Sequence, residues 1–131
     1  MEGRAMPDTS QRLTVTDLKD VKVIDFVDSK ILDEANIAEI GQNLTALATA
    51  KERPKLLLDF ANVDHLSSAA LGMLINVNNR IRQKNGQLRL ASIKPQIFEV
   101  FVITKLNKLF RILPSRTEAL SSFSSAAAPS P

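Results

Sequence analysis

The sequence contains no cysteine among its 131 residues. This absence excludes disulfide bonds, thiolate metal sites and cysteine nucleophiles together, and it is typical of proteins from a reducing compartment. Tyrosine and tryptophan are also missing, and six phenylalanines are too few to suggest a platform for stacking nucleic-acid bases. Lysine and arginine are scattered, in runs no longer than two residues, and the net charge is only +3. We therefore expect no nucleic-acid partner.

Long apolar runs are absent as well. The longest are only a few residues, whereas roughly 20 are needed to span a bilayer. Residues 1–12 also lack the apolar core of a signal peptide. The sequence therefore predicts a cytoplasmic protein without a membrane partner. Its length suits a single domain with a hydrophobic core of its own.

The spacing of apolar residues predicts several short strands. Alternation indicates strands at 12–18 and 20–27, and in the second the alternation slips, which indicates either a bulge or a strand that is apolar on both faces. Residues 55–60, KLLLDF, form the continuous apolar run that is typical of a strand buried on both faces at the centre of a sheet. Further strands are expected at 87–91 and 109–113.

Between these strands the apolar spacing changes to three and four residues, which predicts helices. Either Asp33 or Asn36 is a suitable cap for the first helix, and Asn36 with Glu39 matches a capping box. Asn85–Gly86 supplies the left-handed residue that ends the second helix. The remaining helices are expected at 69–84, after Pro95, and after the S-x-x-E box of Ser115 and Glu118.

In this order, the elements predict an α/β domain. We expect a mixed sheet of four to five strands with helices packed on it, and parallel connections around the strand at 55–60. The domain spans residues 12–123. Residues 1–11 are expected to be a flexible N-terminus, and residues 124–131, SSAAAPSP, a disordered tail, because small and polar residues bury little apolar surface.

The segment DHLSSAALG, residues 64–72, lies at the start of the second predicted helix and invites three interpretations. The first is structural, because serine is among the best helix caps and either Ser67 or Ser68 suits that position. The second is catalytic, with a serine nucleophile and His65 as its base. Asp59 or Asp64 would then orient the histidine. This second interpretation is disfavoured, because the usual G-x-S-x-G elbow is absent and nearby residues seldom converge in this way.

The third interpretation is regulatory phosphorylation. The positive end of a helix tolerates a phosphate, which adds roughly two negative charges. At the centre of a protein-binding surface, this charge breaks the complex by repulsion and desolvation. Small neighbours such as Ala69 and Ala70 let a partner approach the hydroxyl group closely. This interpretation accounts for the serines, the small residues and their position together.

At these residues the sequence resembles a known family. Residues 56–75, LLLDFANVDHLSSAALGMLI, are similar to the signature of STAS domains, the fold shared by anti-sigma factor antagonists and the cytoplasmic ends of sulfate transporters. The resemblance covers about residues 12–123 and includes NGQLRLA, the KP before the third helix and the terminal TEAL. The signature positions that match are Asp59, Val63, Leu66, Ser68, Leu71, Gly72 and Leu74.

The match has departures at the junction itself. The family's aspartate is Ser67 here, its second serine is Ala69, and its glycine is Ala70. The serine that is phosphorylated in anti-sigma factor antagonists maps onto Ser68. Ser67 is a competing acceptor because it is adjacent.

The resemblance implies an anti-sigma factor antagonist that has no catalysis, cofactor or metal of its own. Its expected partners are an anti-sigma factor that is also a serine kinase, with a histidine-kinase-like ATPase fold, and a serine phosphatase. For Asp28 and Asp33, purely structural roles as a turn residue and a helix cap explain the residues as well as contact with a partner does. The alternative function is a scaffold subunit, without phosphorylation, in a larger signalling or lipid-transport complex. The residues expected to bind the partner are Asp28, Asp33, Asp64, His65, Ser67, Ser68, Ala69, Gly72 and Asn76.

Overall fold

The computed structural model describes residues 13–18, 21–50 and 52–127. Within these residues, strands and helices alternate for most of the chain. In chain order they are β1 Leu13–Leu18, β2 Val21–Phe26, β3 Lys30–Ile31, α1 Glu34–Thr49, β4 Lys55–Asp59, β5 His65–Leu66, α2 Ser68–Gln83, β6 Gln87–Ala91, α3 Pro95–Ile103, a 3-10 helix Leu106–Lys108, β7 Arg111–Leu113 and α4 Arg116–Ala127.

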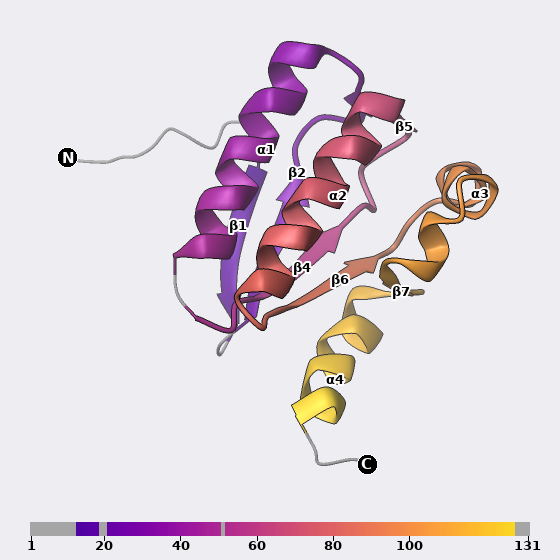
Figure 1. The fold of residues 1–131 in the computed structure, drawn as a ribbon. Coiled ribbons are helices and arrows are strands. Elements are labelled where there is room, and N and C mark those ends of the chain that lie inside the picture. Colours follow the sequence, from indigo (N-terminus) through magenta and orange to yellow (C-terminus); the bar gives the residue numbers. More distant parts are fainter. Residues whose placement is uncertain (1–12, 19–20, 51, 128–131) are drawn as a thin grey trace.

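Five of the strands form one sheet in the order β1-β2-β4-β6-β7 (Figure 1). β1 and β2 are antiparallel, whereas the other three pairs are parallel. Parallel neighbours need a crossover connection, and α1, α2 and α3 provide the three crossovers. The α/β fold with a mixed five-stranded sheet is therefore confirmed, and β4 occupies its centre as the apolar run at 55–60 predicted.

Two of the three inner strands, β2 and β4, have apolar residues on both faces of the sheet. Leu56–Leu58 of β4 have no exposed surface. In β2, the adjacent Val23 and Ile24 are both fully buried, in the two separate cores on opposite faces of the sheet. Every residue of β2 pairs with β1 in an unbroken register. The slip in alternation therefore reflects a strand covered on both faces, and not a bulge.

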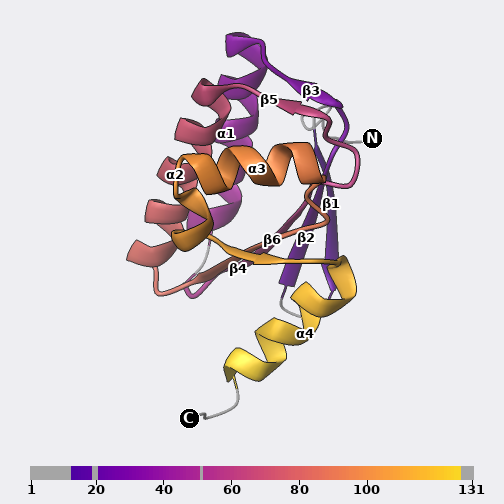
Figure 2. The same cartoon turned by 90° about the vertical axis from the view of Figure 1, so that its right-hand side faces the viewer.

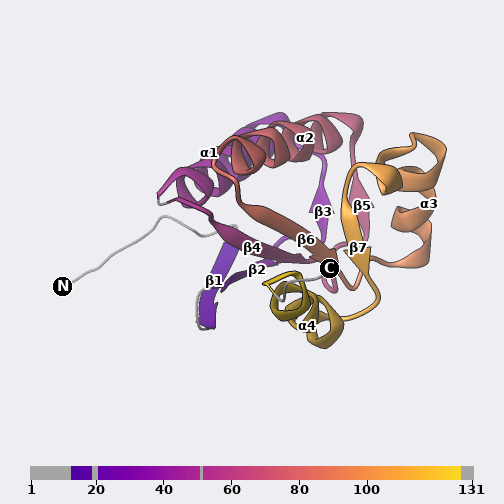
Figure 3. The same cartoon turned by 60° about the horizontal axis from the view of Figure 1, so that its bottom comes forward.

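Helices cover both faces of this sheet (Figure 3). α1 and α2 pack on one face, where Ile97 and Phe101 of α3 join the same core. α4 lies on the opposite face, where Ala119 and Phe123 pack against β2 and β4. This arrangement places the start of α2 and the start of α4 on different sides of the sheet.

Arg89 on β6 holds α4 against the sheet. This side chain is buried, and its Nε donates to the hydroxyl oxygen of Ser122 over 2.9 Å. Its guanidinium carbon also lies 4.8 Å from the centre of the Phe123 ring, a cation–π contact. Burial lowers the pKa of Arg89, and the nearby charge of Arg111 lowers it further.

Asp33 caps α1. Its carboxylate accepts the amide N–H of Ala35 over 2.8 Å, and its backbone is extended, as a cap residue requires. The helix already begins at Glu34, so Asn36 lies inside the first turn. The capping box predicted for Asn36 and Glu39 is therefore wrong, because the cap position was already taken by Asp33.

α4 begins after Ser115, as the S-x-x-E pattern predicted. The Ser115 hydroxyl accepts the amide N–H of Glu118 over 3.2 Å. The helix continues to Ala127, into the segment for which we expected disorder. The expected flexible N-terminus at 1–11 and the last part of the expected tail, 128–131, lie outside the described residues.

Candidate functional site

The two segments expected to form a partner surface lie side by side, although they are far apart in the sequence. β3 and β5 form a separate two-stranded parallel sheet in which Lys30 pairs with His65 (Figure 2). Just beyond this pair, the amide of Ser67 donates to the carbonyl of Ile31 over 3.1 Å. The loop before α1 and the loop before α2 therefore present one continuous surface.

The loop before α2, residues 60–67, is called the serine loop below. Asn62 holds its first half, because its side-chain amide donates to the backbone carbonyls of Val27 over 2.8 Å and Phe26 over 3.2 Å. Sequence analysis did not single out Asn62. Its partners are backbone atoms 35 and 36 residues away, so no local pattern distinguishes it from an ordinary turn residue.

The two serines have different environments. Ser67 is the cap of α2, and its hydroxyl oxygen accepts the amide N–H of Ala70 over 3.2 Å. Ser68 is the first helical residue and is exposed. The cap interpretation therefore applies to Ser67. Aspartate, the signature residue at this position, is also a good helix cap, so either residue suits the start of α2.

The first turns of α2 present an open face. Ser68, Gly72 and Asn76 are spaced by four residues and so lie on the same side of the helix. Ser68, Asn76 and the neighbouring Ala69 are exposed. A Cβ atom added to Gly72 would have no neighbouring atom within 4 Å. Four of the residues expected to bind a partner therefore share one accessible helix face.

Asp64 forms an ion pair with Lys94, which links the serine loop to the residue before α3. The hydrogen bond from Lys94 is the main reason that the pKa of Asp64 lies below its usual value, and it outweighs the opposing effect of desolvation. The charges of Lys94, His65 and Lys30 lower this pKa further. Lys94 belongs to the KP motif that resembles the family, but no role was predicted for it from the sequence.

The remaining two predicted residues flank this surface. Asp33 is exposed and caps α1, so its structural explanation holds whether or not it also contacts a partner. Asp28 is half-buried in the loop between β2 and β3, where it interacts with other residues. Two apolar side chains for which no role was predicted are also exposed: Val27, between β2 and β3, is 51% exposed, and Leu32, between β3 and α1, is 48% exposed. The sequence pattern placed Val27 in the second predicted strand, and no prediction was made for Leu32.

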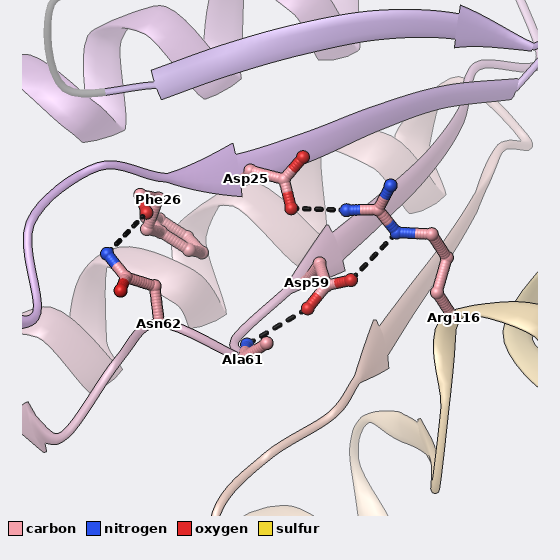
Figure 4. Close-up of polar contacts among 6 residues, drawn as sticks. All are labelled: Asp25, Phe26, Asp59, Ala61, Asn62 and Arg116. Carbon is pink, nitrogen blue, oxygen red and sulfur yellow. Dashed lines mark hydrogen bonds and ion pairs between the residues drawn. The ribbon is translucent and has the colours of Figure 1, made fainter.

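The geometry gives no support to a Ser–His–Asp triad. One carboxylate oxygen of Asp59 accepts Nε of Arg116 over 2.8 Å, and the other accepts the amide of Ala61 over 2.9 Å (Figure 4). Asp64 is engaged in the ion pair described above, and His65 is exposed. Both candidate orienting groups therefore have other partners.

The hydrogen bond to Asp59 is also the main reason that the pKa of Arg116 is raised.

Residues 13–18, 21–50 and 52–127 contain neither a membrane-spanning helix nor a cluster of side chains that could hold a metal ion. No helix there is long and apolar enough to cross a membrane. No group of three or more histidine, aspartate or glutamate side chains there is arranged to hold a metal ion.

Comparison with known proteins places these features in a family. The STAS domain family model matches residues 13–119. BtrV of Bordetella bronchiseptica, by name a candidate anti-sigma factor antagonist, is 32% identical over 96 residues, which cover 73% of this chain and 82% of that protein. An anti-sigma-factor antagonist (STAS) domain protein from Planctomyces limnophilus superimposes with a TM-score of 0.78 at 25% identity, covering 86% of this chain and 97% of that chain.

A third comparison concerns the fold alone. The Bacillus cell fate determinant SpoIIAA in its phosphorylated form superimposes with a TM-score of 0.62 at 15% identity, covering 85% of this chain and 98% of that chain. The family match spans most of the described residues and contains the whole sheet, α1, α2, α3 and the serine loop, and it ends within α4. The chain therefore belongs to the STAS domain family.

Proposed function

We propose that this chain is an anti-sigma factor antagonist and that phosphorylation of Ser68 ends its binding to an anti-sigma factor. In this scheme the anti-sigma factor is also a serine kinase with a histidine-kinase-like ATPase fold. A serine phosphatase then restores the unmodified chain. The chain itself acts as a substrate and a binding partner in the cytoplasm, and supplies no catalysis.

The different environments of the two serines carry this proposal. Ser67 uses its hydroxyl group to cap α2, whereas Ser68 is exposed at the first helical position. A phosphate on Ser68 would lie at the positive end of the helix, which tolerates negative charge. The fold would therefore survive modification of Ser68, and the cap would remain in place.

The surroundings of Ser68 support a protein-binding role. The face of α2 is open at Gly72, which permits close approach of a partner backbone. Exposed Val27 and Leu32, which lie before and after β3, add apolar area of the kind found at the centre of protein interfaces. Roughly two negative charges added between these elements would have to be desolvated in a complex, which opposes binding.

The similar proteins support the same assignment. Both BtrV and the Planctomyces limnophilus protein carry names that describe anti-sigma factor antagonists. SpoIIAA, which shares the fold, has a structure in a phosphorylated form. These names motivate the search for a kinase among the partners of this chain.

The proposal is tested by recovering the partner of the full chain from a lysate of its source organism, adding ATP and locating phosphate by mass spectrometry. We expect an ATP-binding anti-sigma factor and phosphate on Ser68. Ser68→Ala should retain the partner after ATP is added, and Ser68→Asp should lose it. Ser67→Ala is the matched control, because it removes the neighbouring hydroxyl group and leaves the acceptor.

The second candidate function is a scaffold subunit of a larger signalling or lipid-transport complex. The observation that favours it is the serine at position 67, since the signature carries an acid beside the phosphorylated residue. If neither Ser68→Ala nor Ser68→Asp alters partner recovery or biological activity, the switch is refuted and the scaffold role becomes the better assignment.

A further inference from the structure

Asp59 connects the serine loop to the start of α4, which is distant from that loop in the sequence. It is the last residue of β4, directly before the serine loop, and is only 5% exposed. Its Oδ2 accepts Nε of Arg116 over 2.8 Å, and its Oδ1 accepts the backbone amide of Ala61 over 2.9 Å (Figure 4). One buried carboxylate therefore connects the first residue of α4 to the beginning of the serine loop.

The guanidinium group of Arg116 also binds a second carboxylate, that of Asp25 on β2 (Figure 4). Asp25 and Asp59 are opposite each other on paired parallel strands. Two like charges at paired positions repel each other, and a planar guanidinium group between them removes that repulsion while donating to both. Arg116 therefore fixes the orientation of both carboxylates.

A second hydrogen bond connects β2, the strand that carries Asp25, to the serine loop. The next residue, Phe26, offers its backbone carbonyl to the side-chain amide of Asn62, in the middle of the serine loop. Through Asp59 and through Asp25, the contacts of Arg116 thus reach two positions in this loop. Ser68 follows the loop directly, at the start of α2.

We propose that Asp59 is a positioning residue for the serine loop and that Arg116 holds its carboxylate in place. The beginning of α4 and the serine end of α2 are then energetically coupled, although the two helices cover opposite faces of the sheet. A partner that displaces the start of α4 would change how Ser68 is presented. Only this consequence for Ser68 rests on the proposed function, because the coupling is a property of the chain alone.

Hydrogen exchange on the full chain, followed by NMR, tests the coupling. Arg116→Gln removes both charged contacts, and the native side chain is 40% exposed, so the variant should fold. We expect the amide of Ala61 to exchange roughly tenfold faster, a change of the size associated with one charge-assisted hydrogen bond. The amide of Leu90 on β6 reports global stability and is used to normalise the rates.

Two variants make the result specific. Lys22→Gln is the matched control, because it breaks the exposed pair of Lys22 with Asp17 on the same sheet without touching Asp59. Arg116→Lys keeps a positive charge that reaches one carboxylate, and should restore part of the protection at Ala61. The coupling is overturned if Arg116→Gln changes the normalised exchange of Ala61 no more than Lys22→Gln does.

Phosphorylation of Ser68 by the recovered kinase provides the second readout. The coupling predicts a lower kcat/KM for Arg116→Gln, with partial recovery for Arg116→Lys. Faster exchange at Ala61 supports the coupling even if no kinase is found, in which case the proposed function alone fails. Conversely, unchanged exchange refutes the coupling even when Ser68 carries phosphate.

Discussion

The hydroxyl oxygen of Ser67 lies 3.2 Å from the amide nitrogen of Ala70 and caps α2. Replacing a capping serine by alanine lowers stability by about 1 kcal/mol, whereas aspartate is an equally good cap. We therefore expect Ser67→Ala to reduce the free energy of unfolding by that amount and Ser67→Asp to leave it nearly unchanged. Urea denaturation measures both, with Ser68→Ala as the exposed control. An equal loss in Ser67→Asp would contradict the capping role.

Gly72→Ala is expected to stabilise the chain. Alanine is favoured over glycine in helices by about 1 kcal/mol, and its Cβ would meet no atom within 4 Å at this position. Thermal unfolding should therefore move to a higher temperature. In contrast, Gly72→Arg should fold normally but fail to recover the partner, because the long side chain covers the open face of α2. Undiminished recovery with Gly72→Arg would exclude this face from the interface.

The pair between Asp64 and Lys94 predicts a dependence of stability on pH. A carboxyl group whose pKa is lowered in the folded state adds stability above its unfolded pKa, and this contribution is lost as the pH falls through the folded pKa. The stability advantage of the native chain over Lys94→Met should therefore begin to fall at about pH 4, near the ordinary pKa of aspartate, and be lost as the pH falls further through the lower folded pKa. NMR titration of the Asp64 carboxyl carbon should show a higher midpoint in Lys94→Met, and an unchanged midpoint would refute the pairing.

α1 and α2 approach each other closely at Gly41. A Cβ atom at this position would lie 2.8 Å from Cγ of Met73, which is too close unless Met73 moves. Overpacking of this kind costs about 1 kcal/mol or more, so Gly41→Ala should destabilise the chain despite its better helix propensity. In a Met73→Ala background the same change should become neutral or stabilising. A double-mutant cycle measured by urea denaturation gives the coupling, and additive effects would rule out the contact.

Asn85 and Gly86 have separate roles at the end of α2. Asn85 adopts the left-handed backbone conformation, with φ of 59°, so Asn85→Gly should be tolerated. At position 86 glycine is required for space, because a Cβ atom there would lie 2.4 Å from the carbonyl oxygen of Pro54. Gly86→Ala should therefore reduce the free energy of unfolding more than Asn85→Ala does. The opposite ranking in urea denaturation would contradict these assignments.

Much of the fold could be predicted from local patterns. The continuous apolar run of β4 indicated a strand buried on both faces, and Leu56–Leu58 are indeed fully buried. The prediction for the cap of α1 left two residues open, because both Asp33 and Asn36 have suitable side chains. Only packing decides where the first turn begins. The pattern also missed β3 and β5, since two-residue strands are too short to show any alternation.

Part of the site could also be predicted, because some of its features are local sequence patterns. The serines were found because a helix start and a family signature are both local patterns. Lys94 and Asn62 were not assigned any role, since each acts on a partner distant in the sequence. Asp59 was considered as a catalytic orienter, but its two bonds are made to Arg116 and to Ala61.

By itself, the sequence determined the order of the four helices and of the five strands of the main sheet, the central position of β4 and the location of the two serines. Periodicity, caps and turn residues act over a few neighbouring positions, and these are what a sequence displays. Only the tertiary structure decided which serine caps α2, which loops meet through β3 and β5, and how Arg116 reaches Asp59 from 57 residues away. Such contacts depend on the packing of the whole sheet, because no single segment contains both partners.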